Sequence, residues 1–391
     1  MGKRAILVLL AAFMAGALWA APPASTSVTV EELDHLLVNL RGTGDKKAAR
    51  ELAGLKLTER LGLGQLTRWQ ADLPGARSRD ALLALADASA FLRPPASEIP
   101  NVPAPDAATQ DQILVHTFDY VQRTLPRLPN FLAKRTITGF DVTTEDHLNG
   151  MQLMAGPLQA RPNKQFTYLA LGPANASGLP SGQLYWTGSI AEAVSYRDGK
   201  EELEPLEESG GSPGKNPLAL TTEGEFGPIL TVILNEAPRD KIVWDRWEHR
   251  GENGTAANLA VFHFFVPRDR SHYEVAFTAD QIPDFPEYQG EITVDPNDGT
   301  VYRITIDAKV RDSSTVDEAS IMVEYGPAEI GDISYILPIH GVGMAKSFDS
   351  FADLDAQPPP IPFQTAINDI EFTGYHVFRA KSRIVPGAGG P

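Results

Sequence analysis

The chain of 391 residues contains no cysteine. This excludes a disulfide scaffold, a cysteine-ligated zinc site, an iron–sulfur cluster, a thiol nucleophile and a lipidated N-terminal cysteine. Long apolar runs are also missing, because no segment after residue 21 approaches the ~18 apolar residues that span a bilayer. Hydrophobic residues make up 42% of the chain and charged residues 21%, which excludes collagen-like, coiled-coil and wholly disordered proteins.

Enzyme signatures are missing as well. The sequence has no H-E-x-x-H, no G-x-S-x-G and no S-x-x-K with its partner motifs. The segment 210–215 resembles a phosphate loop, but Asn216 stands where Ser or Thr is required. The segment 295–299 lacks the spacing of a calcium loop and predicts a hairpin turn. We therefore expect neither hydrolase nor redox activity, no catalytic residues and no cofactor.

Histidines and carboxylates do not predict a site either. His249, His263 and His272 fall on three successive predicted strands, but their alternation places them on different faces, so we expect no metal site. Acidic pairs such as Glu201 with Glu204 lie in a loop-like stretch and predict a solvated surface.

The N-terminus has the pattern of a secretory signal. Lys3 and Arg4 precede a nearly continuous apolar run, and small residues follow it up to Ala21. We predict a signal peptide over residues 1–21, with an uncleaved anchor as the alternative. Export without cysteine suits a bacterial envelope protein, either periplasmic or extracellular, with no stable membrane span after cleavage.

Negative charge dominates the rest of the chain. The formal net charge is −16, and residues 94–391 carry the acidic excess while residues 22–93 are nearly neutral. Such a field repels phosphate backbones, so we expect no nucleic-acid partner. We interpret the acidity as a source of solubility, with a cationic partner as the alternative.

Hydrophobic spacing divides the mature chain. A capping box at Thr29 and Glu32 opens a run of short amphipathic helices, which predicts a small helical module. Four prolines in residues 95–105 predict an extended linker. The predicted divisions are a helical module over residues 22–93, a Pro-rich linker over 94–106, a β-rich domain over 107–383 and a flexible tail over 384–391.

Within the β-rich domain, a helix with the stripe Leu114, Phe118, Val121 and Leu125 precedes a long series of segments with a period of two. A short helix is predicted at Ile229–Leu234, and a mobile loop at 201–214. The predicted strands are Phe131–Val142, Gln165–Leu171, Gln183–Trp186, Ala191–Tyr196, Lys241–His249, Ala257–Val266, His272–Thr278, Tyr288–Val294, Val301–Val310, Ile321–Tyr325, Tyr335–Leu337, Val342–Phe348 and Glu371–Ala380. Few crossover helices separate them, so the sheet must be mainly antiparallel.

One of these strands differs from the rest. Leu259 to Val266 is apolar on both faces, so both faces must be covered. An antiparallel sheet with helices on its concave face meets this requirement. The predicted fold class is therefore α+β, with a small helical module followed by a large, mainly antiparallel curved sheet.

The element order and several short phrases carry a resemblance. Leu128-Pro129-Asn130-Phe131 links a helix to a strand, and Gly290-Glu291-Ile292-Thr293-Val294-Asp295-Pro296 precedes the hairpin. Residues 107–350 resemble uncharacterised secreted bacterial proteins and, more distantly, the lipoprotein-carrier family of the periplasm with its LolA-like and RseB-like half-barrels. This resemblance implies an incomplete antiparallel barrel that wraps helices around an apolar cavity for acyl chains. No functional residue of that family is carried over.

Aromatic and aliphatic residues around the predicted short helix are the candidate ligand site. We predict that they bind a hydrophobic ligand or a lipidated envelope partner. The candidates are Phe226, Leu230, Ile233, Trp244, Trp247, Phe262, Phe264, Tyr273 and Phe277. An ordinary hydrophobic core explains the same cluster. The alternative functions are a structural or protein-interaction module without a small ligand, and a glycan-acting hydrolase.

Overall fold

The computed structural model describes residues 26–142, 184–206, 225, 228–249, 258–275, 284–310, 316–348 and 363–378. The predicted signal peptide, the predicted tail and the predicted strand Gln165–Leu171 lie outside these residues. The helices are α1 (Val30–Leu40), α2 (Asp45–Ala53), α3 (Leu63–Asp72), α4 (Ala76–Ala88), α5 (Ala107–Thr124) and α9 (Pro228–Glu236), with short 3₁₀ turns at Ala96–Glu98, Leu125–Arg127, Arg239–Lys241 and Arg268–Arg270.

The strands form two sheets. A small parallel pair joins β1 (Thr26–Val28) to β2 (Leu55–Leu57). The large sheet contains β3 (Phe131–Val142), β4 (Leu184–Arg197), β5 (Lys200–Pro205), β6 (Ile242–His249), β7 (Asn258–Val266), β8 (Tyr288–Val294), β9 (Val301–Lys309), β10 (Val316–Ile330), β11 (Ile333–Phe348) and β12 (Phe363–Val377). Its order is β5-β4-β3-β12-β11-β10-β9-β8-β7-β6, and every neighbouring pair is antiparallel.

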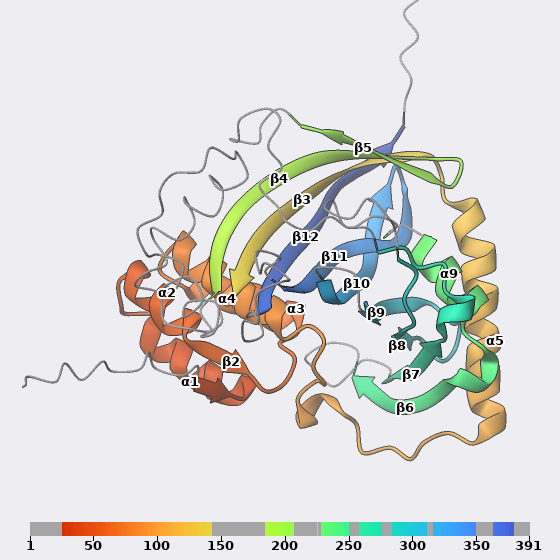
Figure 1. The fold of residues 1–391 in the computed structure, drawn as a ribbon, viewed down its shortest axis with the longest axis horizontal. Helices are drawn as coiled ribbons and strands as arrows, with labels where there is room; N and C mark the ends of the chain where they lie inside the picture. Colours follow the sequence, from red (N-terminus) through yellow and green to blue (C-terminus); the bar gives the residue numbers. More distant parts are fainter. Residues whose placement is uncertain are drawn as a thin grey trace, which may run out of the picture.

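The predicted α+β class, with N-terminal helices followed by an antiparallel sheet, is confirmed. The ten strands form an open sheet with β5 and β6 at its edges. In Figure 1, the helices α1 to α4 lie beside one end of β3, β4 and β12, whereas α5 and α9 lie at the opposite side of the molecule.

The helical module contains the helix cap that the sequence predicts. Thr29 and Glu32 form the reciprocal capping box at the start of α1. The carboxylate of Asp45 accepts hydrogen bonds from the backbone N–H and the hydroxyl of Ser78, which ties α2 to α4. Apolar side chains of α1 to α4 and both short strands then share one core, which includes Leu33, Leu52 and Leu82. The module therefore has its own hydrophobic core.

The two faces of the large sheet are covered by different elements. Phe262 lies opposite Ile292, and Ile292 lies opposite Ile304, so a continuous apolar surface crosses β7, β8 and β9. Side chains of α5 and α9 pack on this surface, which we call the helix face. The opposite face, which we call the module face, meets α4 and the turn after it: Ala84 and Ala90 pack with Phe140, Met322, Val342 and Ile367.

The predicted linker follows the sheet closely at one point. The indole N–H of Trp247 on β6 donates a hydrogen bond to the carbonyl oxygen of Pro103, at 2.9 Å. This contact holds the extended segment between α4 and α5 against the edge of the sheet.

Two local predictions are wrong. The acidic stretch 201–214 was expected to be a loop, but its first residues form β5 and pair with β4. The exposed edge keeps most of these glutamates in water while their backbone groups hydrogen-bond to β4, so acidity did not prevent pairing. The predicted strand His272–Thr278 is not regular where it is described, because Val275 forms only an isolated bridge with Asp284.

The predicted hairpin turn between β8 and β9 is confirmed, and it positions α5. Gly299 has a φ of 76°, and a Cβ at this position would lie 2.2 Å from the backbone carbon of His116 in α5. Gly199, in the turn between β4 and β5, has a φ of 80°, and no atom of the described residues lies within 4 Å of its Cβ position. Both glycines therefore need a positive φ, but only Gly299 also lies against the backbone of α5.

We expect Gly299→Ala to destabilise the protein more than Gly199→Ala. Both substitutions force an alanine into the left-handed region at a cost of about 1–2 kcal/mol. Only Gly299→Ala also pushes α5 away from the hairpin, which adds about 1–3 kcal/mol. Urea unfolding of both variants measures the difference, and equal losses would contradict the close packing of α5 on this turn.

Candidate functional site

The predicted ligand residues that the structure describes lie on the helix face. Leu230 and Ile233 of α9 pack with Phe262 and Phe264 of β7, and all four are almost completely buried. They belong to one cluster that also includes the buried ring of Tyr288. The structure thus brings these predicted residues together as part of a packed core.

Three further candidates form the border of this cluster. Trp244, Trp247 and Tyr273 are partly buried and pack against it. Trp244 contacts both Trp247 and Phe262, with ring centroids 4.7 Å and 5.5 Å apart. Phe226 and Phe277 lie outside the described residues. The aromatic border and the buried cluster are therefore continuous from β6 to α9.

A buried carboxylate holds the end of α9 to the sheet. Glu236, the last residue of α9, accepts hydrogen bonds from the hydroxyl of Tyr288 at 2.8 Å and from the backbone N–H of His272 at 3.0 Å. Burial and this carboxylate raise the pKa of Tyr288 above its ordinary value, so the phenol stays protonated and keeps donating. His272 therefore binds Glu236, while His249 and His263 lie partly exposed on β6 and β7.

The module face carries a set of buried and half-buried charges that the sequence analysis did not predict. We call Arg60, Arg246, Glu248, Glu291, Arg303 and Glu324 the buried ion network. Arg60, from the segment between β2 and α3, pairs with Glu248 of β6 at 2.8 Å, with both side chains buried. Glu248 also binds Arg246 of the same strand. The pair of Arg60 with Glu248 links positions 188 residues apart in sequence.

The network continues across neighbouring strands. Arg246 makes two hydrogen bonds of 2.8 Å to Glu291 of β8. Arg303 of β9 donates to the carbonyl oxygen of Ala90, which follows α4, and its Nε lies 3.9 Å from Glu324 of β10. Arginine side chains thus connect the helical module to β6, β8, β9 and β10.

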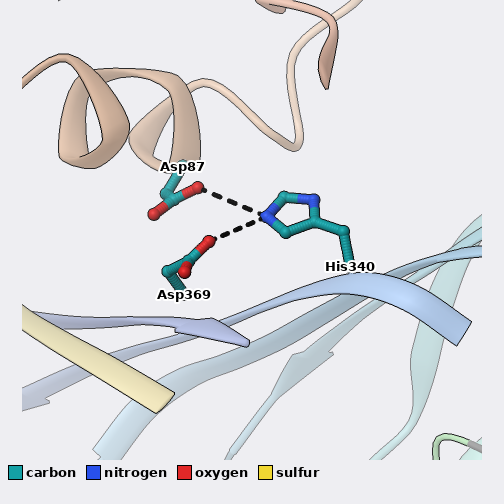
Figure 2. A group of neighbouring side chains, drawn as sticks. All are labelled: Asp87, His340 and Asp369. Atoms are coloured by element: carbon teal, nitrogen blue, oxygen red, sulfur yellow. Dashed lines mark hydrogen bonds and ion pairs between the residues drawn. The ribbon is translucent and has the colours of Figure 1, made fainter. Parts of the chain in front are cut away.

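A second polar group adjoins the network. The His–Asp cluster consists of Asp87 in α4, His340 in β11 and Asp369 in β12, all buried (Figure 2). The Nε2 atom of His340 lies 2.9 Å from Asp369 Oδ1 and 3.8 Å from Asp87 Oδ1. Its Nδ1 atom lies 3.4 Å from Glu324 Oε2. The imidazole therefore stands between carboxylates on both sides.

The electrostatics of the buried ion network favour ionised side chains. Burial raises the pKa of Glu248, but Arg60 and Arg246 outweigh burial, so the pKa lies below its ordinary value. Burial likewise raises the pKa of Glu291, and its hydrogen bonds with Arg246 again reverse the direction. Burial and the charge of Arg60 lower the pKa of Arg303 to about 10, so it remains cationic at neutral pH.

The pKa values in and beside the His–Asp cluster shift in different directions. Burial and the charge of Asp369 raise the pKa of Asp87 well above its ordinary value. Burial lowers the pKa of His340, but Asp369 and Glu324 reverse this and raise it well above the ordinary range. Burial opposes ionisation of Glu324, whose pKa nevertheless falls to about 2 because of His340 and Arg303. Both oxygens of Asp87 are buried without a hydrogen-bond partner among the described residues.

Comparisons with protein-family models, with curated proteins and with solved structures find no match to this chain. Among the described residues, no helix combines the length and the apolar character needed to cross a bilayer.

We expect Glu248→Gln to destabilise the protein by about 3–5 kcal/mol at pH 7, because it leaves the buried Arg60 without the carboxylate that it pairs with and removes one of the carboxylates that bind Arg246. The folded-state pKa of Glu248 is depressed below 4.5, so the contribution of the carboxylate is complete above that pH. It is lost as the pH falls through the folded-state value. The difference between wild type and variant should therefore shrink on acidification.

Urea unfolding from pH 7 to pH 3 measures this difference. Glu329→Gln, an exposed change on β10, serves as the matched control and should leave stability nearly unchanged throughout. A stability loss in Glu248→Gln that stays constant over this range would contradict the assigned ion pair.

Proposed function

We propose that this protein is a non-enzymatic, exported envelope protein that holds an apolar ligand between its sheet and α9. The ligand is a hydrophobic molecule or the acyl chain of a lipidated partner. The observation that carries the proposal is the continuous apolar surface of the helix face, which runs from the buried cluster under α9 to the partly exposed rings of Trp244, Trp247 and Tyr273. Partly exposed aromatic rings beside a buried apolar cluster suit the uptake of an apolar chain.

The architecture adds support. We propose that the open sheet acts as a half-barrel, with α5 and α9 on its concave face, as the resemblance to periplasmic lipoprotein carriers implies. An open sheet, which among the described residues ends at β5 and β6, has the freedom to widen that a closed barrel lacks. The helix that must move is only nine residues long and is fixed to the sheet at its C-terminal end by Glu236.

Packing restricts the class of ligand. Side chains occupy the space under α9, so a ligand there must displace Ile229, Leu230, Ile233 and Leu234. Exposing four such side chains costs about 6–12 kcal/mol. A chain of about 14 buried methylenes contributes ~11 kcal/mol at ~0.8 kcal/mol each, whereas a chain of eight carbons contributes about 6 kcal/mol. We therefore propose long acyl chains as the ligand class.

A second function is favoured by the same packing. If the core under α9 never opens, the protein is a structural or protein-interaction module without a small ligand. The complete burial of Ile233 and Phe264 is the observation that favours this alternative. A glycan-acting hydrolase receives less support, because the buried carboxylates of the module face pair with arginines or with His340 and lie under the helical module.

We expect protein purified gently from its own envelope to carry a long-chain lipid in native mass spectrometry. Delipidated protein should bind a 16-carbon fatty acid and fail to bind an 8-carbon one. Binding should raise amide hydrogen exchange in α9 and leave β8 and β9 unchanged, because α9 is displaced. A ligand-free mass, no binding of the 16-carbon chain and unchanged exchange would instead support the interaction module.

A variant that weakens the attachment of α9 to the sheet gives a second test of this proposal. Tyr288→Phe removes the hydroxyl that binds Glu236 and keeps the apolar ring. If α9 must open, the variant should take up the 16-carbon chain faster than wild type. Tyr335→Phe on β11, outside the helix-face cluster, is the matched control and should behave as wild type.

A further inference from the structure

The His–Asp cluster has the geometry of a metal site. Asp87, His340 and Asp369 each offer one ligand atom, and these atoms lie within 4.8 Å of one another. Figure 2 shows the two carboxylates converging on the Nε2 atom of His340 from α4 and from β12. Tetrahedral Zn²⁺ with bonds of about 2.0–2.2 Å places its ligand atoms about 3.3–3.6 Å apart. The distances from Nε2 of His340 to the two carboxylate oxygens, 2.9 Å and 3.8 Å, lie on either side of this range.

A second observation concerns Asp87 alone. Its side chain is 1% exposed, and neither carboxylate oxygen has a hydrogen-bond partner in the described part of the chain, although one faces His340. Leaving a buried polar group unsatisfied costs about 1–3 kcal/mol, and more for a charged one. Folded proteins avoid this cost, so a buried carboxylate that makes no hydrogen bond to the described residues and faces His340 only at 3.8 Å calls for a further partner. A bound cation meets this need.

The surroundings of the other ring nitrogen of His340, Nδ1, are also those of a metal-binding histidine. Glu324 faces the Nδ1 atom of His340, and Arg303 in turn lies beside Glu324. Metal-binding histidines characteristically donate the N–H of the other ring nitrogen to a carboxylate, which orients the ring and leaves the ligating nitrogen unprotonated. In such a site, Asp87, Asp369 and Glu324 would balance the charge of a divalent cation together with Arg303.

We propose that Asp87, His340 and Asp369 bind one Zn²⁺ ion, with Glu324 orienting His340. An imidazole with two carboxylates suits a borderline transition metal and disfavours Mg²⁺ or Ca²⁺, which prefer oxygen ligands alone. The site is buried at the contact of α4 with β11 and β12, so the ion has a structural role. It joins the helical module to the sheet, independently of any ligand under α9.

The experiment uses the full chain, freed of metal by a chelator and then refolded with or without Zn²⁺. Elemental analysis should find one Zn²⁺ per chain, and Zn²⁺ should raise the Tm of wild type, while Mg²⁺ should leave it unchanged. Asp87→Asn should fold without metal, because an amide removes the buried charge, yet it should bind Zn²⁺ about 100-fold more weakly or not at all. Glu324→Gln should weaken binding by about 10–100-fold.

Asp80→Asn is the matched control, because Asp80 lies on the same helix α4 outside the cluster. It should keep the affinity and the Tm increase of wild type. His376→Ala, an exposed change on β12, tests for binding at surface histidines and should also have no effect. Failure of wild type to take up Zn²⁺, or equal affinity in Asp87→Asn and wild type, would overturn the proposal.

Discussion

The docking of the helical module on the sheet depends on neutralising buried charge. Arg60, Arg246 and Arg303 enter an interface from which water is largely excluded, and each would be costly there without an anion. Glu248, Glu291 and Glu324 supply those anions from three different strands. The network therefore fixes which strand faces which part of the module, because a shift in register would separate cations from anions.

The two sheet faces consequently serve different purposes. The helix face is apolar, and its contacts with α5 and α9 depend on the apolar area that they bury. A small shift of either helix therefore reduces the stabilisation gradually. The module face depends on directional ion pairs that are either made or broken. The proposed binding of a ligand under α9 would use this difference, because α9 would move on the helix face while the ion pairs of the module face stay in place.

Local features of the structure follow from the sequence, and long-range ones do not. The capping box at Thr29, the hairpin at Gly299 and the helix over Pro228–Glu236 each depend on residues within a few positions. Pairing of Arg60 with Glu248 depends on a fold that joins segments 188 residues apart. The sequence does contain a sign of these buried charges, because Arg303, Glu324 and Asp369 interrupt apolar strands. Spacing along the chain, however, does not identify their partners. Strand β5 was not predicted, because its glutamates indicate a loop and the sequence alone does not show that the segment lies at the edge of a sheet.

The central claim is that the buried ion network joins the helical module and the sheet into one cooperative unit. Native-state hydrogen exchange across low urea concentrations tests it most directly, by comparing amides of α4 with amides of β11. The account predicts that both sets open with the same free energy and the same dependence on urea. Opening of α4 at a clearly lower free energy, while β11 remains protected, would contradict it.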